Sequence, residues 1–257
     1  MAGRMDFNGS SSIRWARTSR AWILALAVVA LAGCTGPRFG SPDPASEEAE
    51  HTLELWQGFI FTAAFVGALV VGLITFVLIR FRHRSNEIPN QNDANIPLEI
   101  VYTITPILLV IVLFAFSMAV ERKVTHEVAQ PDLVVNVTGF QWGWQFDYPT
   151  QQVTITGAGA INPPQLVLPV GQTSRLVLRT EDVNHSFWVP PLLVKRDLIA
   201  GVDNAIDVTP TRIGTFDGKC AEYCSLDHWR MIFVLRVVPA DQFDQALAEA
   251  QRAAAGQ

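Results

Sequence analysis

The most regular feature of the hydrophobic pattern is a pair of long apolar runs in the first half of the chain. About twenty-four residues from Trp56 to Ile79, and about twenty-one from Ile100 to Val120, include no charged side chain. An α-helix rises about 1.5 Å per residue, so each run is long enough to cross a hydrocarbon core of about 30 Å. We therefore predict a transmembrane hairpin of two helices over residues 54–122.

A shorter apolar run, residues 21–32, follows four arginines near the N-terminus. It is too short to span a bilayer comfortably, and the combination is typical of a signal peptide. The run ends in Leu-Ala-Gly-Cys, which resembles a bacterial lipobox and implies that Cys34 is lipidated and becomes the first mature residue. An uncleaved short anchor with an incidental cysteine is the alternative. We expect a signal peptide over residues 1–33 and an extended tether, rich in Pro, Ser and acidic residues, over 34–53.

The charges around the two long runs predict their orientation. Arg80, Arg82, His83 and Arg84 lie in the connecting loop. The positive-inside rule places this loop in the cytoplasm and everything after residue 123 on the outer side of a bacterial plasma membrane. The chain has 257 residues, 49% of them apolar, and a net charge of −5. Loss of residues 1–33 would remove four arginines and one aspartate and leave about −8.

The second half of the chain alternates between short β-rich runs and turn residues. This spacing is typical of an all-β sandwich or barrel over residues 123–257. An Ala-rich amphipathic segment, Asp241–Ala255, predicts a terminal helix on its surface. The expected strands are Leu133–Val137, Val153–Ile155, Leu166–Val170, Arg175–Leu178, Phe187–Val189, Ile206–Val208 and Ile232–Val238.

Residues 220–231 read CAEYCSLDHWRM and concentrate soft metal ligands. Cys220, Cys224, His228 and Met231 offer two thiolates, an imidazole and a thioether, which favours copper. A binuclear site needs a second imidazole, and His185 is the candidate outside the apolar half. A disulfide within C-x3-C is an alternative, although so short a loop closes with difficulty. Zinc is a weaker alternative because it rarely binds methionine.

The segment C-x-E-x-C-x3-H-x2-M follows D-V-x-H-S-F-x-V-P by about thirty-five residues, and the pair closely resembles subunit II of the haem-copper cytochrome c oxidases with its copper A centre. The resemblance covers about residues 50–240. It implies a cupredoxin Greek-key barrel with its metal loop, residues 218–231, between the last two strands. It also implies a magnesium ion shared with subunit I through the carboxylate of Glu222. The implied copper ligands are Cys220 and Cys224 as bridges, His185 and His228 as terminal ligands, Met231 as an axial ligand, and the main-chain carbonyl of Glu222.

Two further residues take roles from this resemblance. Trp142 is the first tryptophan of Q-W-x-W, and the family has its electron entry at this tryptophan. Gly143 differs from the tyrosine that many relatives have at the next position. A buried core tryptophan is the alternative. Glu99 belongs to a pattern similar to the family's E-x2-W-T-x2-P, at the mouth of a proton-uptake path into subunit I, with Tyr102 in place of the tryptophan. An interfacial glutamate exposed to water is the alternative.

These features predict an oxidase subunit that takes electrons from cytochrome c and passes them to haem in subunit I, where oxygen reduction is coupled to proton pumping. A membrane-anchored copper carrier or assembly chaperone is the alternative, and the intact ligands argue against a quinol-oxidising relative. The segment from Glu181 to His228 contains eight acidic and four basic side chains. That balance suits a positively charged donor, or forms a generic solvated face. Asp182 belongs either to this rim or to the support of His185. We expect no nucleic-acid partner.

Overall fold

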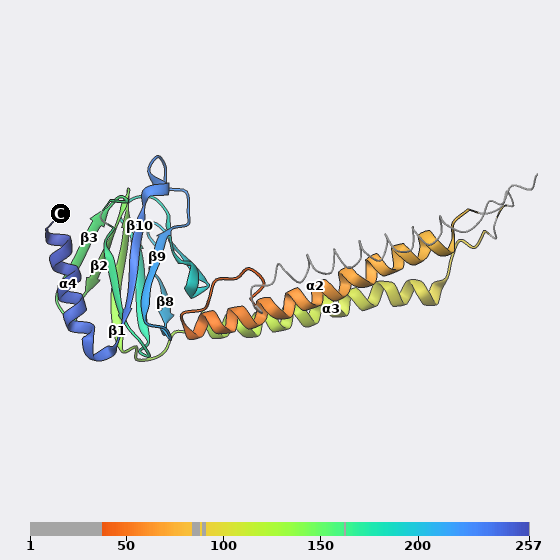
Figure 1. Cartoon of the computed structure of the whole chain (residues 1–257), viewed down its shortest axis with the longest axis horizontal. Coiled ribbons are helices and arrows are strands. Elements are labelled where there is room, and N and C mark those ends of the chain that lie inside the picture. The colour runs from red at the N-terminus through yellow and green to blue at the C-terminus, as the bar shows by residue number, and fades with distance from the viewer. Residues whose placement is uncertain (1–37, 84–87, 89–90, 162, 257) are drawn as a thin grey trace, which may run out of the picture. The chain divides into compact units, whose positions relative to one another are not determined.

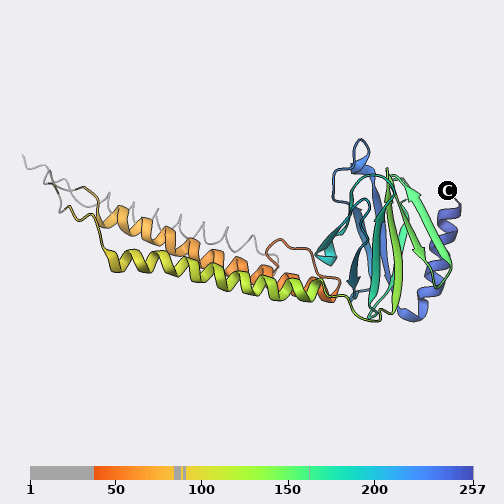
Figure 2. The same cartoon turned by 180° about the vertical axis from the view of Figure 1, so that it is seen from behind.

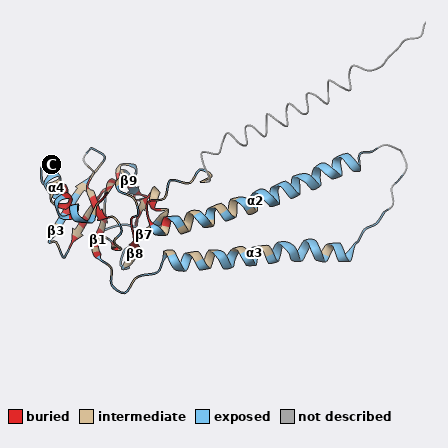
Figure 3. Ribbon diagram, turned by 60° about the horizontal axis from the view of Figure 1, so that its bottom comes forward, coloured by how far each residue is buried: buried red, intermediate tan, exposed pale blue. Residues whose placement is uncertain are grey.

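The computed structural model describes residues 38–83, 88, 91–161 and 163–256. The predicted signal peptide, Cys34 and Arg84 therefore lie outside the described residues. Helices α2 (Glu47–Arg80) and α3 (Ile96–Val124) contain the two long apolar runs. With 34 and 29 residues they extend about 51 and 44 Å, more than a hydrocarbon core needs. Their apolar side chains are exposed within this chain, as the pale blue helices of Figure 3 show.

Helix α2 begins earlier than the sequence suggested. The Ser46 side chain caps it by accepting a hydrogen bond from the Ala49 amide at 3.2 Å. Three acidic residues in the first turn interact favourably with the positive end of the helix dipole. The expectation of an extended tether up to residue 53 is therefore wrong for residues 47–53, because the acidic residues that suggested a tether also stabilise a helix start.

Both ends of the hairpin are hydrogen-bonded to the β domain. Ahead of α2, the Ala45 amide donates to the Pro191 carbonyl and the Ala45 carbonyl accepts from Thr211, each at 2.9 Å. After α3, the Val128 amide donates to Asp207 at 2.7 Å, and the Val128 carbonyl accepts from Arg175 at 2.7 Å. These contacts connect the strands to the two segments that enter and leave the hairpin.

Within the described residues, ten strands form the β domain, in two five-stranded sheets (Figure 1). The order is β3-β2-β1-β5-β8 in one sheet and β4-β10-β9-β6-β7 in the other. The bounds are β1 Leu133–Phe140, β2 Gly143–Tyr148, β3 Val153–Ala158, β4 Gln165–Pro169, β5 Ser174–Thr180, β6 His185–Val189, β7 Val194–Leu198, β8 Asn204–Val208, β9 Gly214–Cys220 and β10 Ile232–Val238. The pairs β1/β5 and β4/β10 are parallel and the others antiparallel. A two-helix hairpin followed by an all-β domain confirms the predicted fold class.

The core lies between the sheets and is rich in aromatic rings. Trp144 and Phe233 meet edge to face at a centroid distance of 5.1 Å, and Phe187 stacks on Phe233 at 5.0 Å. Helix α4, Phe243–Ala255, packs on β3 and β4 and confirms the predicted terminal helix (Figure 2). Strands β2, β7 and β9 were not expected from the sequence.

The predicted metal loop connects β9 to β10, neighbouring antiparallel strands. Gly218 lets β9 lie directly on the core at this point. A Cβ atom there would stand 2.2 Å from the Phe233 ring. The loop therefore starts from a strand that is closely packed two residues before Cys220.

Candidate metal centre

The two cysteines of the loop lie side by side in the interior. Cys220 ends β9 and Cys224 follows in the loop, and their Sγ atoms are 3.9 Å apart. Both thiols are free, and only 5% and 2% of the two residues is exposed. The disulfide that the spacing allowed is therefore not formed, and both sulfurs can bind a metal.

His185 reaches these sulfurs from the neighbouring strand, β6. Its Nδ1 lies 3.8 Å from Cys220 Sγ, and the residue is completely buried. Its Nε2 lies 2.8 Å from a carboxylate oxygen of Asp182. Because a carboxylate accepts, Nε2 carries the proton and the lone pair of Nδ1 points toward the sulfurs. The ligand atoms of His185, Cys220 and Cys224 lie within 4.8 Å of one another.

The rest of the loop completes the group of donors. His228 Nδ1 lies 3.5 Å from Cys224 Sγ, and the thioether sulfur of Met231 lies 3.8 Å from the same atom. On the other side, Cys220 Sγ lies 3.2 Å from the carbonyl oxygen of Glu222. Each sulfur thus has one imidazole nitrogen and one weaker donor beside it. The other four residues expected as ligands therefore each lie beside one of the two sulfurs.

The surroundings make the two thiols unequal. Burial opposes ionisation of Cys220, but the neighbouring His185 and hydrogen bonds with the main chain of Ser186 and Glu222 outweigh it and lower the pKa of the Cys220 thiol. Burial and the neighbouring Cys220 charge raise the pKa of Cys224 to about 12. The hydrogen bonds that Asp182 accepts from His185 and two amides hold the pKa of that carboxyl below its usual value, against the effect of burial. A cation between the sulfurs would relieve their repulsion and release a proton.

Trp142 is attached to the same loop. Its indole N–H donates a hydrogen bond to the Cys224 carbonyl at 2.9 Å, and the residue is half-buried. Gln141 donates to the same carbonyl at 2.9 Å from its side chain, a contact that the sequence did not suggest. Trp144 is completely buried in the core, whereas Trp142 is partly buried and packs against the edge of the core.

Glu99 lies apart from this group, in the first turn of α3. Its carboxylate accepts a hydrogen bond from the Asn95 amide at 3.0 Å, and the Asn95 side chain accepts from Leu98. This reciprocal arrangement caps the helix. Glu99 also lines a shallow pocket with four neighbours on the same helix.

Comparison with known proteins identifies the family. A probable cytochrome c oxidase subunit 2 of Streptomyces avermitilis is 40% identical over 267 residues, which cover 87% of this chain and 83% of that protein. Cytochrome c oxidase subunit 2 of Mycobacterium tuberculosis is 30% identical, with 88% and 80% covered. The family model for the periplasmic domain of cytochrome c oxidase subunit II matches residues 133–238, and that for its transmembrane domain matches residues 36–120. The chain belongs to the cytochrome c oxidase subunit II family.

A solved structure, the periplasmic domain of subunit II of cytochrome oxidase of Bradyrhizobium japonicum, is 29% identical, covers 50% of this chain and 99% of its own, and has a TM-score of 0.46. Membership in the subunit II family makes this chain a two-pass membrane protein and one subunit of an oxidoreductase complex, with other oxidase subunits as partners. The sequence-based prediction of family, fold class and enzyme class is confirmed.

The donor set also fits the copper centre of this family. Two thiolates 3.9 Å apart, each beside an imidazole nitrogen, suit two copper ions bridged by sulfur. Zinc would leave the thioether of Met231 without a role. A copper carrier is not favoured, because donors from two separate strands and a loop enclose the site, whereas a carrier needs ligands that exchange easily. The family and the Cys/His cluster thus support binuclear copper.

Proposed function

We propose that this chain accepts single electrons from cytochrome c at Trp142, holds them at a copper pair bound by the six loop and strand residues, and passes them to haem in subunit I. When bound, a thiolate-bridged copper pair stores one electron spread over both metals. The observation that carries the proposal is the hydrogen bond from the Trp142 indole to the Cys224 carbonyl. It connects a partly exposed aromatic ring to the main chain of a bridging ligand.

The residues around the centre hold it rigid and dry. His185 and Met231 are completely buried, and Asp182 fixes the ring of His185. Asp182 also accepts a hydrogen bond from the Gln141 amide at 2.7 Å. The same carboxylate therefore positions a ligand and the segment that carries Trp142. Rigid ligands favour electron transfer because the geometry changes little with oxidation state.

The test is the variant Trp142→Phe, which keeps an aromatic ring but loses the indole N–H. We expect its rate of oxidation of reduced cytochrome c, measured by stopped flow on the intact oxidase, to fall at least about tenfold, equivalent to about 1.4 kcal/mol. Copper content and the copper spectrum should stay unchanged. Trp56→Phe, at a tryptophan of α2 that lies outside the copper loop, is the matched control. Equal rates for both variants would disprove electron entry at Trp142.

The charge distribution supports a positively charged donor. Glu181, Asp182, Asp203 and Glu222 are exposed members of the acidic set noted in the sequence. Such a rim accelerates the approach of a cationic protein at low salt. The rate with cytochrome c should therefore fall as ionic strength rises, and a salt-independent rate would contradict this part of the proposal.

Glu222 is also proposed to bind magnesium together with subunit I. Its carbonyl faces Cys220, whereas its side chain is exposed and available to a neighbouring subunit. Carboxylate oxygens are suitable ligands for this hard cation. Loss of bound magnesium from the intact oxidase in Glu222→Gln is the expected result, and retention would contradict the role.

Glu99 is proposed to lead protons into subunit I, in support of proton translocation by the complex. It lies in the first turn of α3, at the end of that helix remote from the β domain, where the chain re-enters the membrane after the loop. Proton uptake measured in vesicles should slow in Glu99→Gln, and unchanged uptake would leave only the helix-capping role.

We also propose signal-peptide cleavage and lipidation at Cys34, which the mass of the mature N-terminal peptide would reveal.

A further inference from the structure

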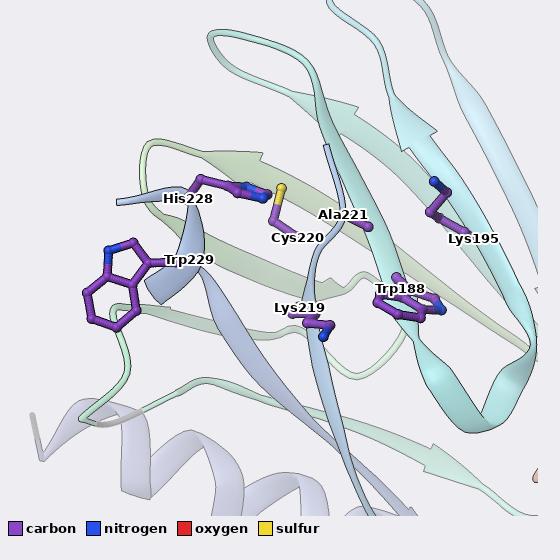
Figure 4. A pocket seen from close by; sticks show the side chains of 7 residues that line it. All are labelled: Trp188, Lys195, Lys219, Cys220, Ala221, His228 and Trp229. Atoms are coloured by element: carbon purple, nitrogen blue, oxygen red, sulfur yellow. The ribbon is translucent and has the colours of Figure 1, made fainter. Parts of the chain in front are cut away.

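Copper must reach a centre in which four of the six ligand residues are buried. His185 and Met231 are completely buried, and Cys224 is 2% exposed. The two ligands that line an open pocket are Cys220 and His228. This pocket has a volume of about 650 Å³ and is bounded further by Trp188, Lys195, Lys219, Ala221 and Trp229 (Figure 4). A second pocket near the loop, beside Trp142 and Arg230, includes none of the six ligands.

Strand pairing creates the wall of this pocket. Trp188 on β6 stands opposite Lys195 on β7 and opposite Lys219 on β9. The three side chains therefore share one face of the sheet, with the aromatic ring between two ammonium groups. The Lys219 ammonium lies 4.6 Å from the centre of the Trp188 ring. Figure 4 shows the Cys220 sulfur next to the His228 ring at the far side of the same pocket.

The positive charge of Lys195 and Lys219 determines whether the pocket attracts a cationic or an anionic form of copper. Within the described part of the chain, neither Lys195 nor Lys219 has a carboxylate at ion-pair distance. Two unpaired ammonium groups repel a hydrated copper cation and attract an anion. Cu(I) held by two thiolates carries a net negative charge, so it combines the ion that this centre needs with the charge that this pocket favours.

We propose that the pocket bounded by Trp188, Lys195 and Lys219 is the entry route for copper, that it selects an anionic Cu(I)–thiolate complex, and that Cys220 is the first residue to bind the ion. In this ligand exchange a copper–sulfur bond forms at Cys220 and one to the donor thiolate breaks. Copper stays Cu(I), and any proton on Cys220 goes to the leaving thiolate. The inference rests on the proposed copper function of this chain.

The test compares copper loading by two probes of opposite charge. The full-length chain, purified in detergent, stripped of metal and reduced, is mixed with either the Cu(I)–glutathione complex or the cationic Cu(I)–acetonitrile complex. Loading is stopped at timed intervals with a strong Cu(I) chelator, and the copper retained by the chain is counted. In Lys195→Glu at low salt, loading from the glutathione complex should slow about three- to tenfold. Loading from the acetonitrile complex should not slow.

Arg179→Glu is the matched control, because it makes the same charge change on an exposed strand position of the other sheet. Equal loading rates for Lys195→Glu and the unchanged chain, or equal slowing in Arg179→Glu, would overturn the proposal. The final copper content separates this outcome from failure of the proposed function. Two ions per chain at unchanged rates reject only the entry route, whereas fewer than two ions in the unchanged chain reject the copper centre itself.

The order of binding is tested with the two cysteines. Cys224→Ser should keep the rapid capture of one ion and its dependence on Lys195, because the thiol at the pocket remains. Cys220→Ser should lose this phase. Rapid capture that depends on Lys195 in Cys220→Ser would contradict first binding at Cys220.

Discussion

Asp182 connects one of the proposed copper ligands to the segment that carries Trp142. One carboxylate oxygen lies 2.8 Å from His185 Nε2, and the other accepts from the Gln141 amide. We predict that Asp182→Ala lowers copper affinity by about 10- to 100-fold, the usual effect of losing a carboxylate behind a metal-bound imidazole. Competition with a chelator of known affinity measures the change.

The matched control for this prediction is Asp203→Ala. Asp203 pairs with Arg179 on the surface, and its side chain is 76% exposed. Its removal takes away the same charge without touching a ligand. If both variants lost affinity equally, net charge and not the orientation of His185 would be the cause.

The sequence could group the candidate donors because five of the six ligand residues lie within twelve residues. His185 could be added because it was the remaining histidine outside the apolar half, together with the resemblance of its motif. The role of Asp182 could not be decided, since a position three residues before a ligand fits either the rim or the ring. Gln141 could not be foreseen, because its contact with Cys224 depends on how two sheets bring together segments 83 residues apart.

At the scale of elements, one partly buried ion pair fastens the end of the hairpin to the β domain. Asp207 on β8 accepts from Arg175 on β5 at 2.7 and 2.8 Å, and from the Val128 amide. The Asp207 side chain is 4% exposed. Asp207→Ala would leave the Arg175 charge and the Val128 amide without this partner, so we predict a loss of about 3–5 kcal/mol in the free energy of unfolding.

Denaturant unfolding of the chain in detergent, followed by tryptophan fluorescence, measures this loss. Asp203→Ala again provides the comparison, since the exposed pair with Arg179 should contribute no more than about 1 kcal/mol. A small loss in both variants would show that Asp207 does not fasten the segment after α3.

The strands that the sequence missed have a common physical reason. β7 reads VKRDL, with three consecutive charged residues, and β9 reads GTFDGKC, with charged residues at exposed positions, so the hydrophobic signal of both strands is diluted. β2 reads GWQFDY, and its aromatic residues suggested an electron conduit before they suggested a strand. Long uninterrupted patterns such as β10 were placed correctly. The start of α2 depended on Ser46 as a cap, which an acidic, Pro-containing segment conceals.

At the scale of the whole chain, the two ends of the hairpin are fastened to neighbouring parts of the β domain. Ala45 is held by Pro191 and Thr211, and Val128 by Arg175 and Asp207. Glu48 adds hydrogen bonds from the Thr209 amide at 3.2 and 3.3 Å. These contacts restrict rotation of the domain about either connection, and a restricted domain can hold its copper ligands in a fixed position relative to the membrane.

The attached β domain can accept electrons only if it lies on the side of the membrane where the electron donor is found. The arginines after α2 predict that the loop between the helices is cytoplasmic and the domain external. Thr150→Cys, in an exposed turn of the domain, should therefore react with a membrane-impermeant maleimide in intact cells. Asp93→Cys, in the loop, should react only after the cells are permeabilised.

The unchanged chain is the blank for this experiment, because Cys220 and Cys224 are buried and Cys34 is common to every variant. Labelling of Asp93→Cys in intact cells, with Thr150→Cys protected, would invert the topology. Cytochrome c on the outer side could then not reach Trp142, so this single measurement decides whether the electron entry proposed at the residue scale is compatible with the arrangement of the whole chain.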